Sequence, residues 1–76
     1  MKKIFNTEII ERYLKENDIS KKEFCLACKI PLSTLNKIFK HNTDFDIVHL
    51  FRLAFYLNIE VKDLFQKNEP KDPFFA

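Results

Sequence analysis

Apolar residues recur at helical spacing in four stretches of the chain, and each stretch predicts one amphipathic helix. The predicted helices cover residues 7–16, 21–28, 32–40 and 47–57. A short fifth helix over residues 61–66 is expected to bring Leu64 and Phe65 onto the same core. Because no segment alternates apolar and polar residues with a period of two, the pattern predicts an all-α fold without a sheet.

One face of each predicted helix carries the residues expected in the core. They are Ile9, Ile10, Tyr13 and Leu14 in the first helix; Phe24, Cys25 and Cys28 in the second; Leu35, Ile38 and Phe39 in the third; and Ile47, Leu50, Phe51, Ala54 and Leu57 in the fourth. Together these faces supply one small hydrophobic core.

Three helices begin with the same local pattern, in which a polar N-cap follows an apolar residue that can pack against the fourth helical residue. The apolar pairs are Phe5 with Ile10, Ile19 with Phe24, and Phe45 with Leu50, around the caps Asn6, Ser20 and Asp46. Glu23 stands at the third helical position after Ser20, which predicts a capping box. Asn58 suits the left-handed residue that ends the fourth helix.

The chain has 76 residues, of which 46% are hydrophobic and 32% charged, and this predicts one domain with a single core. We expect the domain to cover residues 1–67 and a Pro-containing tail to cover residues 68–76. Glycine is absent, which excludes the Gly-rich phosphate loops of nucleotide enzymes. The apolar runs are far shorter than the roughly 20 residues that cross a bilayer, and no signal sequence follows Lys2 and Lys3. We therefore expect a cytoplasmic protein with no membrane partner.

The basic side chains gather in one stretch. Residues 21–40 carry five lysines against one acidic residue, whereas residues 1–20 are balanced and residues 41–76 carry two more acidic than basic side chains. The five lysines are Lys21, Lys22, Lys29, Lys37 and Lys40. Such a concentration of positive charge favours a polyanionic partner such as nucleic acid.

The spacing of the cysteines and histidines is similar to part of a zinc-finger motif, but the full spacing does not predict a metal site. Cys25, Cys28 and His41 reproduce the start of a zinc-finger spacing, but His49 comes too late to complete that motif. Both cysteines also lie on the buried face of the second helix, where they act as small apolar residues. No pair of acids and no nucleophile–base spacing stands out. We therefore expect no metal, no cofactor and no enzymatic activity.

The second and third predicted helices, joined by Lys29, Ile30 and Pro31, form a helix-turn-helix arrangement. At these residues the sequence resembles the Cro and lambda-repressor type (Xre-like) DNA-binding domains of phages and bacteria. The family's Ser-Gln helix start, Leu-Ala pair, Gly-Val turn and later Leu-rich segment correspond to Ser20-Lys21, Phe24-Cys25, Lys29-Ile30, Leu53–Ile59 and Asp63–Phe65. The likeness extends from Thr7 to Phe65 and implies a compact five-helix lambda-repressor-like domain.

Four positions depart from the family's pattern. Lys29 stands where glycine is usual, and a non-glycine residue in a left-handed turn costs about 1 kcal/mol. Pro31 replaces a capping serine or threonine and so removes a cap of about 1 kcal/mol, although its fixed φ preorganises the first turn. Phe39 stands where glutamate is common, and His41 where a terminal glycine is common.

The resemblance assigns the outward face of the third helix to DNA. It implies that Leu32, Ser33 and Lys37 reach base edges, with Leu32 against a thymine methyl and Lys37 on guanine O6 or N7. The residues implied to bind phosphates are Ser20, Lys21, Lys22, Thr34, Asn36, Lys40 and Asn42. The amides at the start of the second helix add to the same phosphate site.

We therefore expect a transcriptional regulator, acting as a repressor, that binds double-stranded operator DNA as a homodimer and takes no small-molecule ligand. Dimerisation is implied by the family and by the weak binding of a single module at physiological salt, with the fifth helix and the tail as its candidate interface. The alternative is a protein-interaction module of the same fold, a partner of a repressor or a toxin, that does not bind DNA. Lys37 and Lys40 favour DNA, whereas Phe74 and Phe75 in the tail favour a protein partner.

Overall fold

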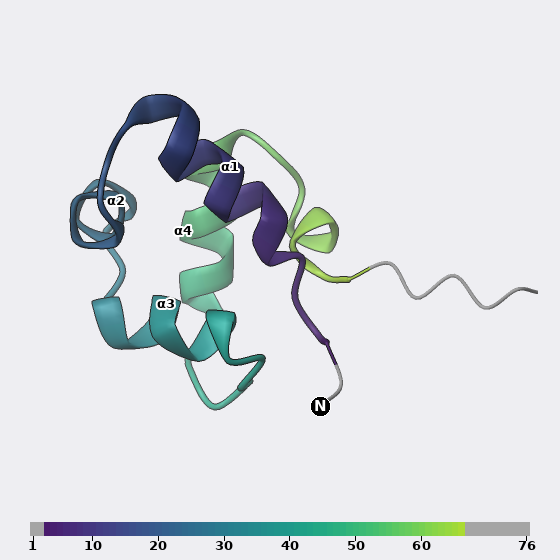
Figure 1. The fold of residues 1–76 in the computed structure, drawn as a ribbon. Helices are drawn as coiled ribbons and strands as arrows, with labels where there is room; N and C mark the ends of the chain where they lie inside the picture. The colour runs from purple at the N-terminus through teal and green to yellow at the C-terminus, as the bar shows by residue number, and fades with distance from the viewer. Residues whose placement is uncertain (1–2, 67–76) are drawn as a thin grey trace, which may run out of the picture.

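A computed structural model describes residues 3–66 of the chain, and within them it contains four α-helices followed by one 3₁₀ helix. The helices are α1 (Thr7–Asn17), α2 (Lys21–Cys28), α3 (Leu32–Phe39), α4 (Val48–Leu57) and the 3₁₀ helix η1 (Val61–Leu64). In Figure 1, α4 lies in the middle of the domain, between α2 on one side and η1 on the other. The predicted all-α fold is confirmed, and the four predicted helices agree with these bounds to within one residue.

The predicted fifth α-helix is not formed, because η1 is 3₁₀ and ends at Leu64. The backbone of Phe65 is extended, with φ −93° and ψ 144°. This segment pairs with the residues before α1: the amide of Asn6 donates to the carbonyl of Leu64 at 2.7 Å, and the amide of Gln66 donates to the carbonyl of Ile4 at 2.8 Å. A continuing helix needs those same backbone groups. The expected five-helix architecture is therefore corrected to four α-helices and one 3₁₀ helix.

α2 begins and ends where the sequence predicts, because its caps are local. The amide of Glu23 donates to Oγ of Ser20 at 3.1 Å, and the amide of Ser20 donates to Oε1 of Glu23 at 3.3 Å, which completes the predicted capping box. Lys29 ends the helix in the left-handed region, with φ 62°. Asn58 ends α4 in the same way, with φ 58°.

The core is formed by one set of buried hydrophobic side chains. Its members are Phe5, Ile10, Phe24, Cys25, Cys28, Ile30, Leu35, Ile38, Leu50, Leu53, Ala54 and Leu64. The predicted inner face of α4 is wrong at two positions, since Ile47 and Phe51 are 56% and 54% exposed. Leu53 is fully buried in their place. The error arises because apolar residues surround this helix, so that their spacing fits more than one orientation.

Residues 3–66 contain no strand, and Phe5 and Phe65 form an isolated antiparallel bridge. No helix in this part of the chain is both long enough and apolar enough to cross a membrane. The predicted tail over residues 68–76, with Phe74 and Phe75, lies outside the described residues.

Candidate nucleic-acid interface

The outward face of α3 is polar apart from a leucine at its first residue. Leu35 and Ile38 are 0% and 1% exposed, so that the opposite face of the helix is turned to solvent. Leu32 lies at the edge of that face and is 41% exposed. The other exposed residues of α3 and its C-cap are Ser33, Asn36 and Lys40. The structure thus brings four of the predicted DNA-binding residues onto one surface.

Thr34 does not share that surface, because its side chain is buried and the residue is only 3% exposed. Its Oγ1 lies 3.0 Å from Nδ1 of His49 on α4. A hydrogen bond of this kind contributes about 1 kcal/mol and fixes the first turn of α3 against α4. The hydroxyl of Thr34 is therefore not available to a phosphate. Thr34 instead holds α3 against α4, and the predicted phosphate contact of its side chain is corrected at this position.

The side chains of Lys37 and Asn42 are engaged with the loop that follows α3. Lys37 is half-buried, and its Nζ donates to the carbonyl of Asp44 at 2.7 Å. Asn42 is exposed, and its Oδ1 accepts from the amide of Asp44 at 2.8 Å. Lys37 gives up its hydrogen bond when it turns to DNA, whereas the bond of Asn42 uses only Oδ1 and leaves the Nδ2 group able to donate to a phosphate.

The start of α2 combines positive charge with helix amides. Lys21 and Lys22 are exposed, and the first four amides of a helix have no acceptor within it. The capping box satisfies the amide of Glu23, while those of Lys21 and Lys22 have no intrahelical partner and suit an anion. Nζ of Lys21 also lies 4.3 Å from the centre of the Phe39 ring. This cation–π contact joins the start of α2 to the end of α3.

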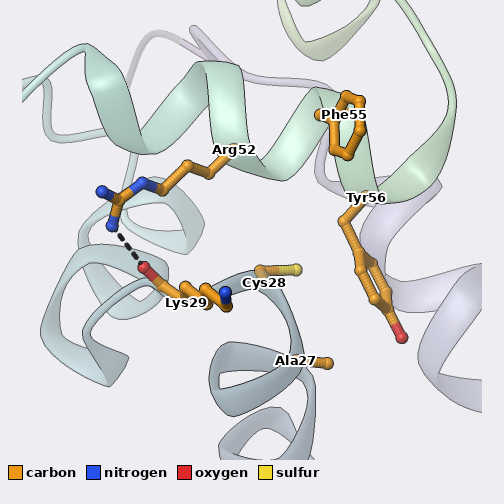
Figure 2. A pocket seen from close by; sticks show the side chains of 6 residues that line it. All are labelled: Ala27, Cys28, Lys29, Arg52, Phe55 and Tyr56. Carbon is orange, nitrogen blue, oxygen red and sulfur yellow. Dashed lines mark hydrogen bonds between the residues drawn. The ribbon is translucent and has the colours of Figure 1, made fainter.

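The turn between α2 and α3 is held by its own backbone and by a side chain from α4. The amide of Ile30 donates to the carbonyl of Cys25 at 3.1 Å. Nη1 of Arg52 donates to the carbonyl of Lys29 at 2.8 Å, and Figure 2 shows the arginine reaching across from α4 to make this bond. The angle between α2 and α3 therefore depends on α4 as well as on the turn.

A comparison with known proteins agrees with this geometry. The family model of the Cro/C1-type HTH DNA-binding domain matches residues 10–69, which is most of the chain. The chain belongs to this family. A search of curated proteins found no match. The resemblance predicted from the sequence is confirmed, and in general terms the protein is a DNA-binding regulator.

In this Cro/C1-type domain, two positions where the family commonly has glycine keep the left-handed conformation without it. Lys29 has φ 62° and His41 has φ 57°. A non-glycine residue costs about 1 kcal/mol at such a position. Local contacts offset that cost: Arg52 bonds the carbonyl of Lys29, and Nδ1 of His41 accepts the amides of Ile4 and Phe5 at 3.0 and 3.1 Å. His41 thereby ties the end of α3 to the segment before α1.

Sequence reasoning missed the supporting roles of His41, His49 and Arg52. Each acts through a partner far away in the chain, so that helical spacing carries no information about it. One signal was present: His49 and Arg52 are the polar residues of a helix that is otherwise apolar or aromatic. A polar group on such a helix needs a partner, which makes it a candidate for a structural hydrogen bond.

The two cysteines of this Cro/C1-type domain are core thiols, as the sequence predicts. Cys25 and Cys28 are 3% and 4% exposed. Burial, with a smaller contribution from the neighbouring Cys25, raises the pKa of Cys28 to about 12, and burial also raises the pKa of Cys25. The raised pKa values favour the protonated form of both thiols at neutral pH. Within residues 3–66, no three His, Cys, Asp or Glu side chains form a group that could hold a metal ion.

Proposed function

We propose that this protein is a sequence-specific transcriptional repressor that places α3 in the major groove of double-stranded DNA. The observation that carries the proposal is Leu32, a leucine left 41% exposed at the first residue of the recognition helix, beside the exposed Ser33. An apolar side chain at that position gains from contact with a thymine methyl, which only the major groove displays. The positive charge of α2 and α3 supplies the attraction to phosphates that brings the helix there.

Base reading is assigned to Leu32, Ser33 and Lys37. Ser33 can donate to or accept from a base edge. Lys37 must first release the carbonyl of Asp44, and because this hydrogen bond has a charged donor it contributes about 1.5–3 kcal/mol. A good contact with guanine contributes about 1–3 kcal/mol of discrimination. The two energies are similar in size, so guanine compensates for the lost hydrogen bond better than other base edges do, and Lys37 is expected to leave the loop mainly at guanine.

Phosphate binding is assigned to two groups of residues on either side of α3. At the start of α2, Lys21 and Lys22 provide charge, and Ser20 holds the helix end in place while the amides contact the phosphate. The second group consists of exposed residues on the outward face of α3, at its C-terminal end and in the loop that follows. These residues are Asn36, Lys40 and Asn42. These contacts fix the register of α3, and they carry no sequence preference of their own.

Repression requires only that the operator be occupied selectively. One module with a few phosphate contacts binds weakly at physiological salt, whereas two modules on half-sites one helical turn apart gain a large factor in affinity. We therefore assign the protein a homodimeric form on DNA.

Selection of bound duplexes from a random pool, carried out at two salt concentrations, tests the proposal directly. We expect one enriched motif, repeated as two half-sites with a spacing of about 10 base pairs. Binding should weaken steeply at the higher salt concentration, because phosphate contacts release counterions. A pool that shows no enrichment even at low salt overturns the proposal.

The double variant Lys37→Ala, Lys40→Ala tests the location of the interface. It should lose duplex binding and remain folded by circular dichroism, with its melting temperature lowered only by the loss of the hydrogen bond from Lys37 to the carbonyl of Asp44. The matched control is Lys15→Ala, Lys62→Ala, which removes the same charge from exposed positions on α1 and η1. An equal loss of binding in the control would show that net charge, and not the face of α3, determines affinity.

A further inference from the structure

α4 is apolar around nearly its whole circumference, which is unusual for a helix at the surface of a small domain. Leu50, Leu53 and Ala54 face the core. On the opposite side the exposed residues are Ile47 (56%), Val48 (43%), Phe51 (54%) and Phe55 (88%). A helix that is apolar on all sides is normally buried on all sides. The outward side of α4 therefore has the character of a surface that is covered in the working form of the protein.

Ile47, Phe51 and Phe55 follow one another at intervals of four residues and form a ridge along α4, which we call the α4 stripe. Arg52 is the charged residue on this side of the helix, but its guanidinium is drawn to the carbonyl of Lys29. Figure 2 shows Arg52 and Tyr56 reaching from α4 toward α2, and Phe55 remains 88% exposed. The stripe is thus free of charge along its length.

We propose that a second copy of this chain covers the α4 stripe, with the two α4 helices antiparallel across a two-fold axis at Phe51. Ridges of residues four apart interdigitate well in helix pairs. With the axis at Phe51, this residue meets the partner's Phe51, and Ile47 meets the partner's Phe55. Such a contact is self-complementary and closed, so it forms a dimer and not a filament. The inference rests on the proposed function only in that it names the interface of the DNA-bound pair.

The exposed area of the α4 stripe, together with Val48 beside it, approaches the lower limit of a specific dimer interface. An aromatic side chain buries roughly 150–250 Å², so Phe51 and Phe55, at 54% and 88% exposure, offer roughly 200–350 Å² in each copy. Symmetry doubles this to roughly 400–700 Å². Ile47 and Val48 bring the total close to the roughly 1,000 Å² of a specific interface.

Charge favours a second copy over an acidic partner on this surface. The α4 stripe itself carries no ionisable group, and the Arg52 beside it is held by the carbonyl of Lys29. Lys29 and Arg52 line a pocket of about 400 Å³ between α2 and α4, with Phe55 at its edge. An acidic peptide would be drawn to that pocket and would leave Ile47 and Phe51 uncovered.

The α4 stripe is closely connected to α3 within each copy. Ile47 stands directly before the first residue of α4 and follows the loop that starts at the end of α3. The α3 helix of each copy is therefore connected to the dimer axis by one short loop and by the hydrogen bond between Thr34 and His49. The interface predicted from the sequence, the fifth helix with the tail, is replaced in this proposal by α4.

Sedimentation of the full chain over a concentration series tests the interface. We expect the wild type to reach a dimer, and Phe51→Glu and Phe51→Lys each to remain monomeric. Mixing these two variants should restore a dimer, because an axis at Phe51 places the glutamate opposite the lysine. Leu26→Ser is the matched control, since Leu26 is 71% exposed on α2 and lies outside the stripe, and this variant should dimerise like the wild type.

A dimer that survives Phe51→Glu, or a wild type that stays monomeric even on a duplex with two half-sites, overturns this proposal. If both Phe51 variants are unfolded by circular dichroism, Phe55→Ser provides the test, because that ring is 88% exposed and its loss leaves no cavity. Restoration of the dimer by mixing is a result that a general defect in folding cannot produce.

DNA binding separates this proposal from the proposed function. Phe51→Glu should bind a duplex with one half-site as the wild type does, and it should bind two half-sites about 100-fold more weakly, the factor that linkage of two modules supplies. A wild type that dimerises but binds no duplex leaves the interface intact and overturns the DNA-binding proposal alone. A Phe51→Glu variant with unchanged affinity for two half-sites overturns the interface alone.

Discussion

α1 and α4 are helices of similar length that differ in what they present to solvent. Each buries one face: Ile10 of α1 is 1% exposed and Leu53 of α4 is 0% exposed. The outward residues of α1 are charged, namely Glu8, Glu11, Arg12, Lys15 and Glu16. The outward residues of α4 include Phe51 and Phe55. Water is a sufficient partner for the outer face of α1, whereas the outer face of α4 gains free energy only when another surface covers it.

The same difference decides which helix can be oriented from the sequence. In α1 the polar residues mark the outside, so the inner face follows from spacing alone. In α4 the predicted face contains Ile47, Phe51 and Leu57, and the observed inner face contains Leu53 and Leu57. The two sets fit helical spacing equally well, so spacing does not decide between them. A helix with two apolar faces carries two patterns, one for the fold and one for a partner. Assigning the exposed pattern, with Ile47 and Phe51, to the core is the error that such a helix is expected to produce.

The largest expected change in the free energy of unfolding comes from a substitution on the inner face of α4, and it distinguishes that face from the outer one. Leu53→Ala should lower the free energy of unfolding by about 3 kcal/mol, since it removes a fully buried side chain and leaves a cavity. Ile10→Ala in α1 should cost a similar amount, because the two inner faces are equivalent in the core. Urea denaturation of both variants measures the effect. A loss below about 1 kcal/mol for Leu53→Ala would show that α4 is rotated relative to this structure.

The next effect concerns the polar contact between Thr34 and His49, by which α4 holds α3. Thr34→Val keeps the shape of the side chain but leaves Nδ1 of His49 without a partner, and we expect a loss of about 1–2 kcal/mol in the free energy of unfolding. Ser33→Ala, one residue away on the exposed face, should change stability by less than about 0.5 kcal/mol. Thermal melting of the two variants at equal concentration makes the comparison. Equal shifts would mean that the Thr34 contact contributes nothing.

The local features of the fold were predictable from the sequence. Ser20 and Glu23 define the start of α2 within four residues, and the left-handed residue at Lys29 follows from the position of the turn. The existence of α3 and its inner face follow from Leu35 and Ile38. These features depend on neighbours in the chain, so propensity and spacing determine them.

The features that could not be predicted depend on contacts between distant segments. Thr34 lies on the flank of a helical wheel, and only the approach of His49 from α4 decides that it is buried. The end of η1 is set by the pairing of Phe65 with the chain before α1. For the candidate interface, spacing predicted the exposure of Ser33 and Asn36 but not the tether of Lys37 to the loop.

A smaller effect compares how α1 and α4 begin. Oδ1 of Asp46 accepts the amide of Val48 at 3.0 Å, whereas the side chain of Asn6 makes no capping hydrogen bond. Asp46→Ala should therefore lower the free energy of unfolding by about 1 kcal/mol, and Asn6→Ala by a few tenths of that amount. Urea denaturation at low and high salt measures both changes. The loss from Asp46→Ala should shrink at high salt, because part of it is the attraction of a carboxylate to the helix N-terminus.

The smallest effect in the monomer is expected on the two outer faces, where the helices differ most. Phe55→Ser and Glu11→Ser replace exposed residues and should each change the free energy of unfolding by less than about 0.5 kcal/mol, provided that the protein is dilute enough to be monomeric. At high concentration the two should diverge. Association stabilises the folded chain by mass action, so the midpoint of wild type and Glu11→Ser should rise with concentration while that of Phe55→Ser stays constant. A midpoint that rises equally in all three proteins would show that the outer face of α4 is exposed without a partner, as that of α1 is.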